Sequence, residues 1–128
     1  MSASLLILTV GTGTGQPLNL AQGLDNTLHQ LRPRKFWLVP SASPDSTALA
    51  EIVRDDAPSD CAFQPWSSTQ PFRRIEQHDD LFVCRTALRE VIHQARQQLR
   101  QGERLIVNPT SGTKQMSVAA ALAALDEE

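Results

Sequence analysis

The sequence has few of the features that mark membrane, secreted or metal-binding proteins. No apolar run in its 128 residues approaches the roughly 18 residues of a membrane span. The first residues, MSASLLILTVGTG, lack the basic start and the small-residue cleavage site of a signal peptide. Cys61 and Cys84 are the two cysteines, and they stand alone without metal-ligand spacing. We therefore expect a cytoplasmic protein with reduced thiols and no membrane association.

Positive charge is also scarce. Twelve Lys and Arg residues against 14 Asp and Glu residues give a formal net charge of −2. Affinity for long nucleic acids depends on clustered Lys and Arg, so we expect no long nucleic acid to bind and any anion site to be small and local. The three histidines have no pair at metal-ligand spacing, and no metal site is predicted.

The apolar pattern predicts one domain that spans residues 1–128. Apolar residues make up 41% of the chain, which suits a compact core of modest size. Continuous apolar or β-branched runs predict strands at 5–10, 35–41, 61–68 and 104–108. The third of these is weak, because Pro65 removes a ladder donor and fits best at a sheet edge. Helical spacing predicts helices at 16–31, 43–56, 81–102 and 115–125.

This alternation of strands and helices predicts an α/β fold. The βαβαβαβα order favours a Rossmann-like open parallel sheet with right-handed crossovers, strand order 3-2-1-4 and helices on both faces. We expect Ser43 to cap the second helix and Asp79 or Asp80 to cap the third. Trp37, on a strand that should be buried, is expected in the core.

The last predicted helix is apolar on every side from Val118 to Leu125. A helix of this kind is normally covered all round, and four strands and four helices are too few to cover it. Either a partner subunit packs there, or the chain is the front part of a longer protein.

Two loops at the predicted carboxyl edge of the sheet are rich in glycine and hydroxyl groups. GTGTG (11–15) follows the first strand and NPTSGTK (108–114) follows the fourth. In an open sheet of order 3-2-1-4, ligands bind in the crevice between these two strands. Glycines let the backbone approach a ligand, and N–H groups at helix starts favour phosphate. Lys114 opposes the helix dipole there, which is unfavourable unless an anion sits nearby.

The best-known nucleotide motifs do not fit these loops. In GTGTGQ, Gln16 stands where a dinucleotide fingerprint has its last glycine, and no acidic residue ends the second strand. NPTSGTKQ lacks the spacing of an ATP-binding P-loop. No cofactor is therefore predicted, and GTGTG taken alone is equally compatible with a simple tight turn.

The segment NPTSGTKQMS after a strand, together with VGTGTG after the first strand, resembles the CRISPR-associated Rossmann-fold (CARF) domains. Their pattern reads roughly N-x-T-G-G-T-K-x-M. Six residues match it, and Ser111 departs by standing where glycine is usual; the matching residues are Asn108, Thr110, Gly112, Thr113, Lys114 and Met116.

The resemblance implies a sensor function. CARF domains form homodimers that bind cyclic oligoadenylate, the second messenger of type III CRISPR systems, across the dimer axis, and a separate or C-terminal effector responds. A ring with approximate two-fold symmetry suits an isologous dimer. The ligand-binding residues implied here are Gly11, Thr12, Gly13, Thr14, Asn108, Thr110, Ser111, Gly112, Thr113 and Lys114.

Two other functions stay open at this point. Some CARF domains are ring nucleases, which open the same ligand without metal by attack of a ribose 2′-hydroxyl on its own phosphodiester. Lys114 with Thr12 or Thr14 would then be catalytic. A plain α/β scaffold, or an enzyme that acts on another nucleotide, is the third possibility.

Three further residues have both a functional and a structural interpretation. Trp66 could stack on an adenine, but packing beneath the second helix is favoured. Arg73 and Arg74 could reach a phosphate, but an ordinary role as solvated loop arginines is favoured.

Overall fold

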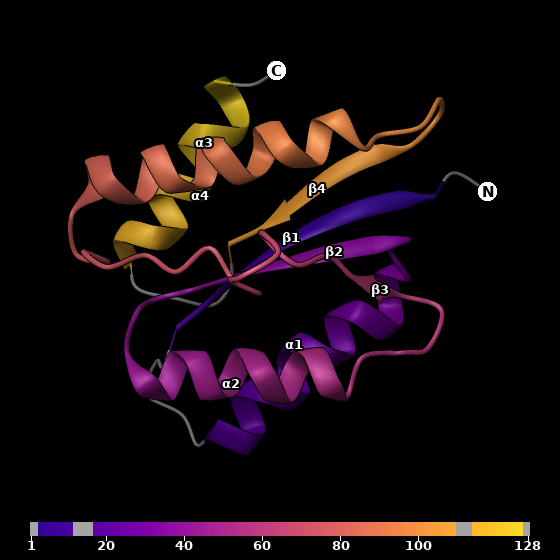
Figure 1. The fold of residues 1–128 in the computed structure, drawn as a ribbon, viewed down its shortest axis with the longest axis horizontal. Helices are drawn as coiled ribbons and strands as arrows, with labels where there is room; N and C mark the ends of the chain where they lie inside the picture. Colours follow the sequence, from indigo (N-terminus) through magenta and orange to yellow (C-terminus); the bar gives the residue numbers. More distant parts are fainter. Residues whose placement is uncertain (1–2, 12–16, 110–113, 127–128) are drawn as a thin grey trace.

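The computed structural model describes residues 3–11, 17–109 and 114–126. Its strands and helices alternate along the chain, as the sequence predicts (Figure 1). In order, they are β1 (Ser4–Val10), α1 (Pro17–Leu31), β2 (Lys35–Pro40), α2 (Pro44–Asp55), β3 (Ala62–Phe63), α3 (Leu81–Gln97), β4 (Arg104–Asn108) and α4 (Lys114–Asp126).

The strands form one parallel sheet in the order β3-β2-β1-β4, which confirms the predicted fold class and strand order. β1 lies in the middle and is buried along its whole length. Its partner residues run from Leu5 opposite Lys35 to Val10 opposite Pro40 on one side. On the other side, Ser4 lies opposite Arg104 and the register ends with Leu8 opposite Asn108. The carboxyl ends of β1 and β4 therefore meet at one edge.

Helices cover both faces of the sheet, as predicted (Figure 1). The alternating side chains of β1 divide between two hydrophobic clusters, because successive residues of a strand point to opposite faces. Leu5 and Ile7 pack with α3 and α4, whereas Leu6 and Leu8 pack with α1 and α2. Trp37 lies in the first cluster and is buried, so its predicted place in the core is confirmed.

The third strand lies at the sheet edge, as Pro65 suggested, but it is shorter than predicted. Only Ala62 and Phe63 pair with β2 as a strand, and the chain then turns away. It returns at Ile75, whose N–H donates to Pro40 O over 2.9 Å, and Ala42 N–H donates to Ile75 O over 3.0 Å. The segment before Ile75 is thereby held at the carboxyl end of β2.

The predicted helix caps are confirmed. Ser43 Oγ accepts from Ser46 N–H over 3.1 Å at the start of α2. Asp80, one of the two candidates, caps α3: its Oδ1 accepts from Phe82 N–H at 2.9 Å and Val83 N–H at 3.1 Å. These contacts satisfy N–H groups that have no partner inside the helix.

Helix α3 ends at Gln97 and does not reach Gly102, so the predicted end lay too far along the chain. The N–H groups of Gln98 and Leu99 donate to the carbonyl oxygens three residues back, Ala95 O and Arg96 O, which forms a tighter turn than an α-helix. The carbonyl of Gln98 accepts from Arg34 Nη2 over 2.9 Å. Gly102 lies in the turn that follows, with φ of 84°, a left-handed conformation that favours glycine.

Trp66 does not pack beneath the second helix, contrary to the favoured structural interpretation. It packs against the cluster that contains Trp37 and α3, on the opposite face of the sheet from α2. Gln94 of α3 joins the two tryptophans, because its Oε1 accepts from Trp37 Nε1 at 2.7 Å and its Nε2 donates to Trp66 O at 3.0 Å. The loop after β3 is therefore fastened to α3.

Both cysteines are free and buried, as expected for reduced thiols. Burial is the main cause that raises the pKa of the Cys61 thiol and of the Cys84 thiol, which makes both poor nucleophiles. Among the helices that the structure describes, none combines the length and apolar character needed to cross a membrane.

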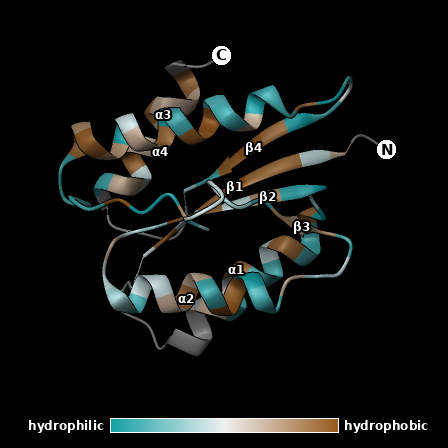
Figure 2. Ribbon diagram, in the orientation of Figure 1, coloured by the Kyte–Doolittle hydropathy of each residue, from teal (hydrophilic) through white to brown (hydrophobic). Residues whose placement is uncertain are grey.

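Among the residues that the structure describes, helix α4 is covered on one side only. Met116, Ala119, Ala120 and Ala123 are buried against the α3 side of the core. The other side carries Val118, 43% exposed, and Leu125, 62% exposed. Figure 2 shows much of α4 in brown and pale tones, and both of these exposed side chains are apolar.

A bidentate ion pair closes the amino-terminal edge of the sheet. Arg34 Nε lies 2.6 Å from Glu103 Oε2 and Arg34 Nη2 lies 2.9 Å from Glu103 Oε1. The Glu103 side chain is only 5% exposed. The hydrogen bonds from the Arg34 guanidinium are the main cause that lowers the pKa of Glu103 to about 2.

We predict that Glu103→Gln lowers stability at neutral pH, because the amide loses the charge and offers an N–H toward the donors of Arg34. A depressed carboxyl pKa contributes stability that is present above the ordinary value of 4.5 and is lost as the pH falls toward 2. The stability difference between wild type and variant should therefore shrink over that window. Urea unfolding at several pH values measures it, with Glu51→Gln at an exposed position as the control. A stability difference that stays constant across this pH window would show that the Glu103 carboxylate does not stabilise the fold through its lowered pKa.

Candidate functional site

The two glycine-rich loops leave the sheet from neighbouring strands. β4 ends at Asn108, opposite Leu8, and β1 continues to Val10 and the buried Gly11. Gly11 and Asn108 therefore lie at the predicted crevice, and Lys114 is the first residue of α4. The remaining predicted site residues lie outside the described residues: Thr12, Gly13, Thr14, Thr110, Ser111, Gly112 and Thr113. Their roles stay predictions, as do the contacts of the Lys114 side chain.

The return of the chain from β4 into α4 is fixed by two contacts. Ser117 Oγ donates to the carbonyl oxygen of Pro109 over 2.6 Å. Met116 is fully buried in the cluster beside α3. Met116 entered the sequence motif without a role, and its burial shows that it anchors the first turn of α4 in the core. Ser117 was not singled out, although a hydroxyl in the first turn of a helix is a common partner for a loop carbonyl.

Three serine hydroxyls meet where β2 passes into α2. Ser41 Oγ donates to Ser46 Oγ over 2.6 Å, and Ser43 Oγ donates to it over 2.9 Å. Ser41 and Ser46 are buried. The prediction that Ser43 acts as a helix cap is correct, and Ser41 directs its hydroxyl inward to the same cluster. These serines shape the edge of the crevice and hold α2 against the strand ends.

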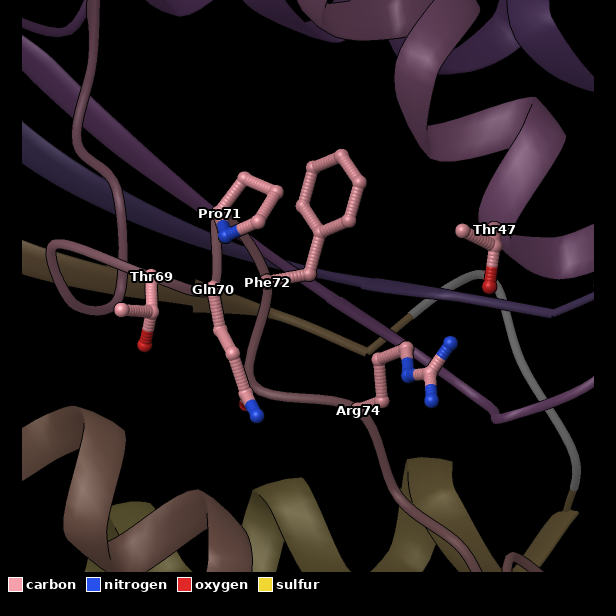
Figure 3. A pocket seen from close by; sticks show the side chains of 6 residues that line it. All are labelled: Thr47, Thr69, Gln70, Pro71, Phe72 and Arg74. Atoms are coloured by element: carbon pink, nitrogen blue, oxygen red, sulfur yellow. The ribbon is translucent and has the colours of Figure 1, made fainter.

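A cavity of about 270 Å³ opens beside the start of α2 (Figure 3). Thr47 lines it from α2, and the segment that returns toward Ile75 supplies the rest of the wall: Thr69, Gln70, Pro71, Phe72 and Arg74. In Figure 3 the side chain of Arg74 extends toward the start of α2, where Thr47 lies. Sequence reasoning missed this cavity, because it depends on where the long connection after β3 folds back.

The neighbouring arginines Arg73 and Arg74 have different surroundings. Arg73 donates to Arg74 O over 2.8 Å and pairs with Glu90 of α3 at 3.2 Å, so it serves the α3 side. Arg74 is 50% exposed, and its nearest acid is Glu76 at 3.8 Å. Arg73 and Arg74 point to opposite faces because successive residues of an extended backbone do so. Their neighbours follow the same pattern, since Phe72 packs with the α1 and α2 cluster and Ile75 with the α3 and α4 cluster. Arg73 is thus a structural arginine, and Arg74 is placed at a cavity wall.

One solved structure relates this fold to a protein with a bound ligand. Csm6 of Enterococcus italicus, bound to cyclic hexa-2′-fluoro-hexa-dAMP, superposes with a TM-score of 0.69 at 13% sequence identity. The match covers 98% of this chain and 31% of that chain, so this chain spans about a third of its length. At this identity the likeness shows the fold alone. No protein-family model matches the sequence, and no curated protein does.

Metal ligands do not gather in the part of the chain that the structure describes. Across residues 3–11, 17–109 and 114–126, no three His, Cys, Asp or Glu side chains come close enough to hold an ion. The predicted site residues that the structure describes at the crevice are Gly11, Asn108 and the start of α4 at Lys114.

We predict that Ser117→Ala loosens the connection between β4 and α4, because the carbonyl of Pro109 loses its hydrogen bond. Loss of one such bond lowers stability by about 1 kcal/mol. Tryptic cleavage after Lys114, followed by mass spectrometry, should become faster. Ser117→Thr keeps the hydroxyl and should behave as the wild type. Equal cleavage rates for Ser117→Ala and wild type would contradict a role for this bond.

Proposed function

We propose that this chain is a CARF-type domain that binds cyclic oligoadenylate at the carboxyl edge of its sheet, across a homodimer, as a sensor in type III CRISPR defence. The observation that carries the proposal is the side-by-side ending of β1 and β4, from which the two motif loops leave. The ligand of Csm6, which shares this fold, supports the choice of ligand class.

The chemistry of the motif fits a ring of phosphodiesters. Each loop is rich in glycine, so backbone N–H groups can approach phosphate oxygens closely. Lys114 is the one formal positive charge in either loop sequence. Threonine and serine hydroxyls of the loops can bond phosphate or ribose hydroxyls. A dimer would present this set twice, which matches the approximate symmetry of the ring.

The exposed apolar side of α4 supports the dimer. Val118 and Leu125 lie on it, and a helix that is apolar all round is normally covered all round. α4 begins at the crevice, so a second copy packed on this helix would stand next to the same ligand.

The first experiment follows the ligand itself. The protein is incubated with cyclic oligoadenylates of several ring sizes in the presence of a chelator, and bound and free nucleotides are then separated. We expect one ring size to be retained intact. Linear products with a 2′,3′-cyclic phosphate would contradict the pure sensor and indicate the ring nuclease. Failure of every ring to bind would overturn the proposed ligand.

We predict that Lys114→Ala weakens cyclic oligoadenylate binding by roughly 10- to 100-fold, because a charge-assisted contact to phosphate is worth about 1.5–3 kcal/mol. Lys114→Arg should recover only part of the affinity, since the guanidinium fork differs in shape from an ammonium. Stability should hold or rise slightly, because a lysine opposes the dipole at a helix start. Calorimetric titration and thermal unfolding measure both quantities. If Lys114→Ala unfolds the protein while its folded fraction binds with normal affinity, the role of the loop is structural and the proposed phosphate contact is wrong.

We predict that Val118→Glu and Leu125→Glu convert the dimer to a monomer, because each places a charge in an apolar contact. Light scattering at micromolar concentration measures the mass. Leu31→Glu introduces the same change at an exposed leucine on α1 and is the control. If the wild type is already monomeric with and without ligand, the proposed dimer is wrong.

A further inference from the structure

We infer that the cavity beside α2 receives an unpaired adenine base of the ligand, with Arg74 against the face of the base and Gln70 at its edge. This inference rests on the proposed function, since it assigns a place to one part of the cyclic oligoadenylate. The proposed function assigns the loops at the crevice to phosphate and ribose, and it assigns no residue to a base.

The cavity lies within reach of the crevice. Ile75 is held on Pro40 at the end of β2, and Pro40 lies opposite Val10 at the end of β1. Neighbouring strands are about 5 Å apart, and Ile75 lies beside β2 on the side away from β1, so the wall that carries Arg74 stands about two strand spacings from the loop after β1. A base attached to a ribose in the crevice spans that kind of distance. The volume of about 270 Å³ is below that of a typical small-molecule site and suits one part of a larger ligand.

The balance of charge favours a base over a second phosphate. Among the described residues that line the wall, Arg74 is the one with a cationic side chain. One acid stands near it, Glu76 at 3.8 Å from the Arg74 guanidinium. Pro71 and Phe72 contribute apolar surface. A phosphodiester anion would meet the Glu76 carboxylate, whereas a neutral heterocycle gains contact from both the apolar wall and the guanidinium.

Arg74 and Gln70 have the groups that recognise an unstacked adenine. A planar guanidinium stacks on a base face, which is a common mode for single-stranded RNA. A glutamine amide pairs with the acceptor and the exocyclic amino group on one edge of adenine. The backbone of Gln70 is held by Ser67, whose Oγ accepts from Gln70 N–H over 3.0 Å and whose N–H donates to Gln70 O over 2.9 Å. Its side-chain amide has no hydrogen-bond partner among the residues that the structure describes.

The test compares two rings on matched variants by calorimetric titration. One ring is the cyclic oligoadenylate retained by the wild type, and the other carries hypoxanthine bases, which lack the exocyclic amino group. The variants are Gln70→Ala and Arg74→Ala. Gln101→Ala and Arg96→Ala remove the same groups from exposed positions near the opposite edge of the sheet and are the controls. Circular dichroism checks that each variant is folded.

We expect the wild type to prefer the adenine ring by about tenfold or more, and Gln70→Ala to lose most of that preference. Arg74→Ala should weaken both rings by about tenfold, and Arg74→Lys should recover little, because an ammonium keeps the charge but not the plane. Lys114→Ala should weaken both rings and keep the preference.

Different outcomes overturn different conclusions. Wild-type affinity and preference in Gln70→Ala and Arg74→Ala would overturn the base pocket and leave the proposed function standing. If Arg74→Lys recovered full affinity, the group met by Arg74 would be a phosphate, and the base assignment would be wrong. If the wild type bound neither ring, the proposed function would fail, and this inference with it.

Discussion

The parallel pairing of β1 with strands on both of its sides is the constraint on which the rest of the structure depends. β1 is buried along its length. Its alternate residues pack in the two hydrophobic clusters against which all four helices lie. The same pairing sets Leu8 opposite Asn108 and Val10 opposite Pro40. It therefore brings the starts of the two motif loops and the end of β2 to one edge, where a ligand can contact segments far apart in the sequence.

Most of the named residues at this edge fix the starts of helices, and one is available to a ligand. Met116 and Ser117 fix the first turn of α4, and the serine cluster around Ser46 fixes the first turn of α2. Both helices begin at this edge, and a helix start favours negative charge nearby. Arg74 is the exception, because the fold places it at this edge while its only described ion pair is the 3.8 Å contact with Glu76. An arginine so weakly paired retains most of its capacity for a ligand.

Sequence reasoning reached the strand order, the two covered faces, the cap Ser43 and, as one of two candidates, the cap Asp80, because continuous apolar runs and helical spacing are local and strong signals here. It failed where contacts distant in sequence decide the outcome. The end of α3 depends on Arg34 and Glu103, the packing of Trp66 depends on Gln94, and the cavity depends on the return of the chain at Ile75. None of these has a local pattern. The motif loops were found from their positions after the predicted strands and from their resemblance to the CARF pattern, and their detailed roles stay predictions.

The central claim is that cyclic oligoadenylate binds where β1 and β4 end. Backbone amide chemical shifts, recorded by NMR as the ring is added, test it most directly. The account predicts the largest changes at Gly11, at Asn108 and in the first turn of α4, with the turn around Gly102 at the opposite edge unaffected. Changes confined to the Gly102 edge, or none at saturating ring concentration, would contradict it.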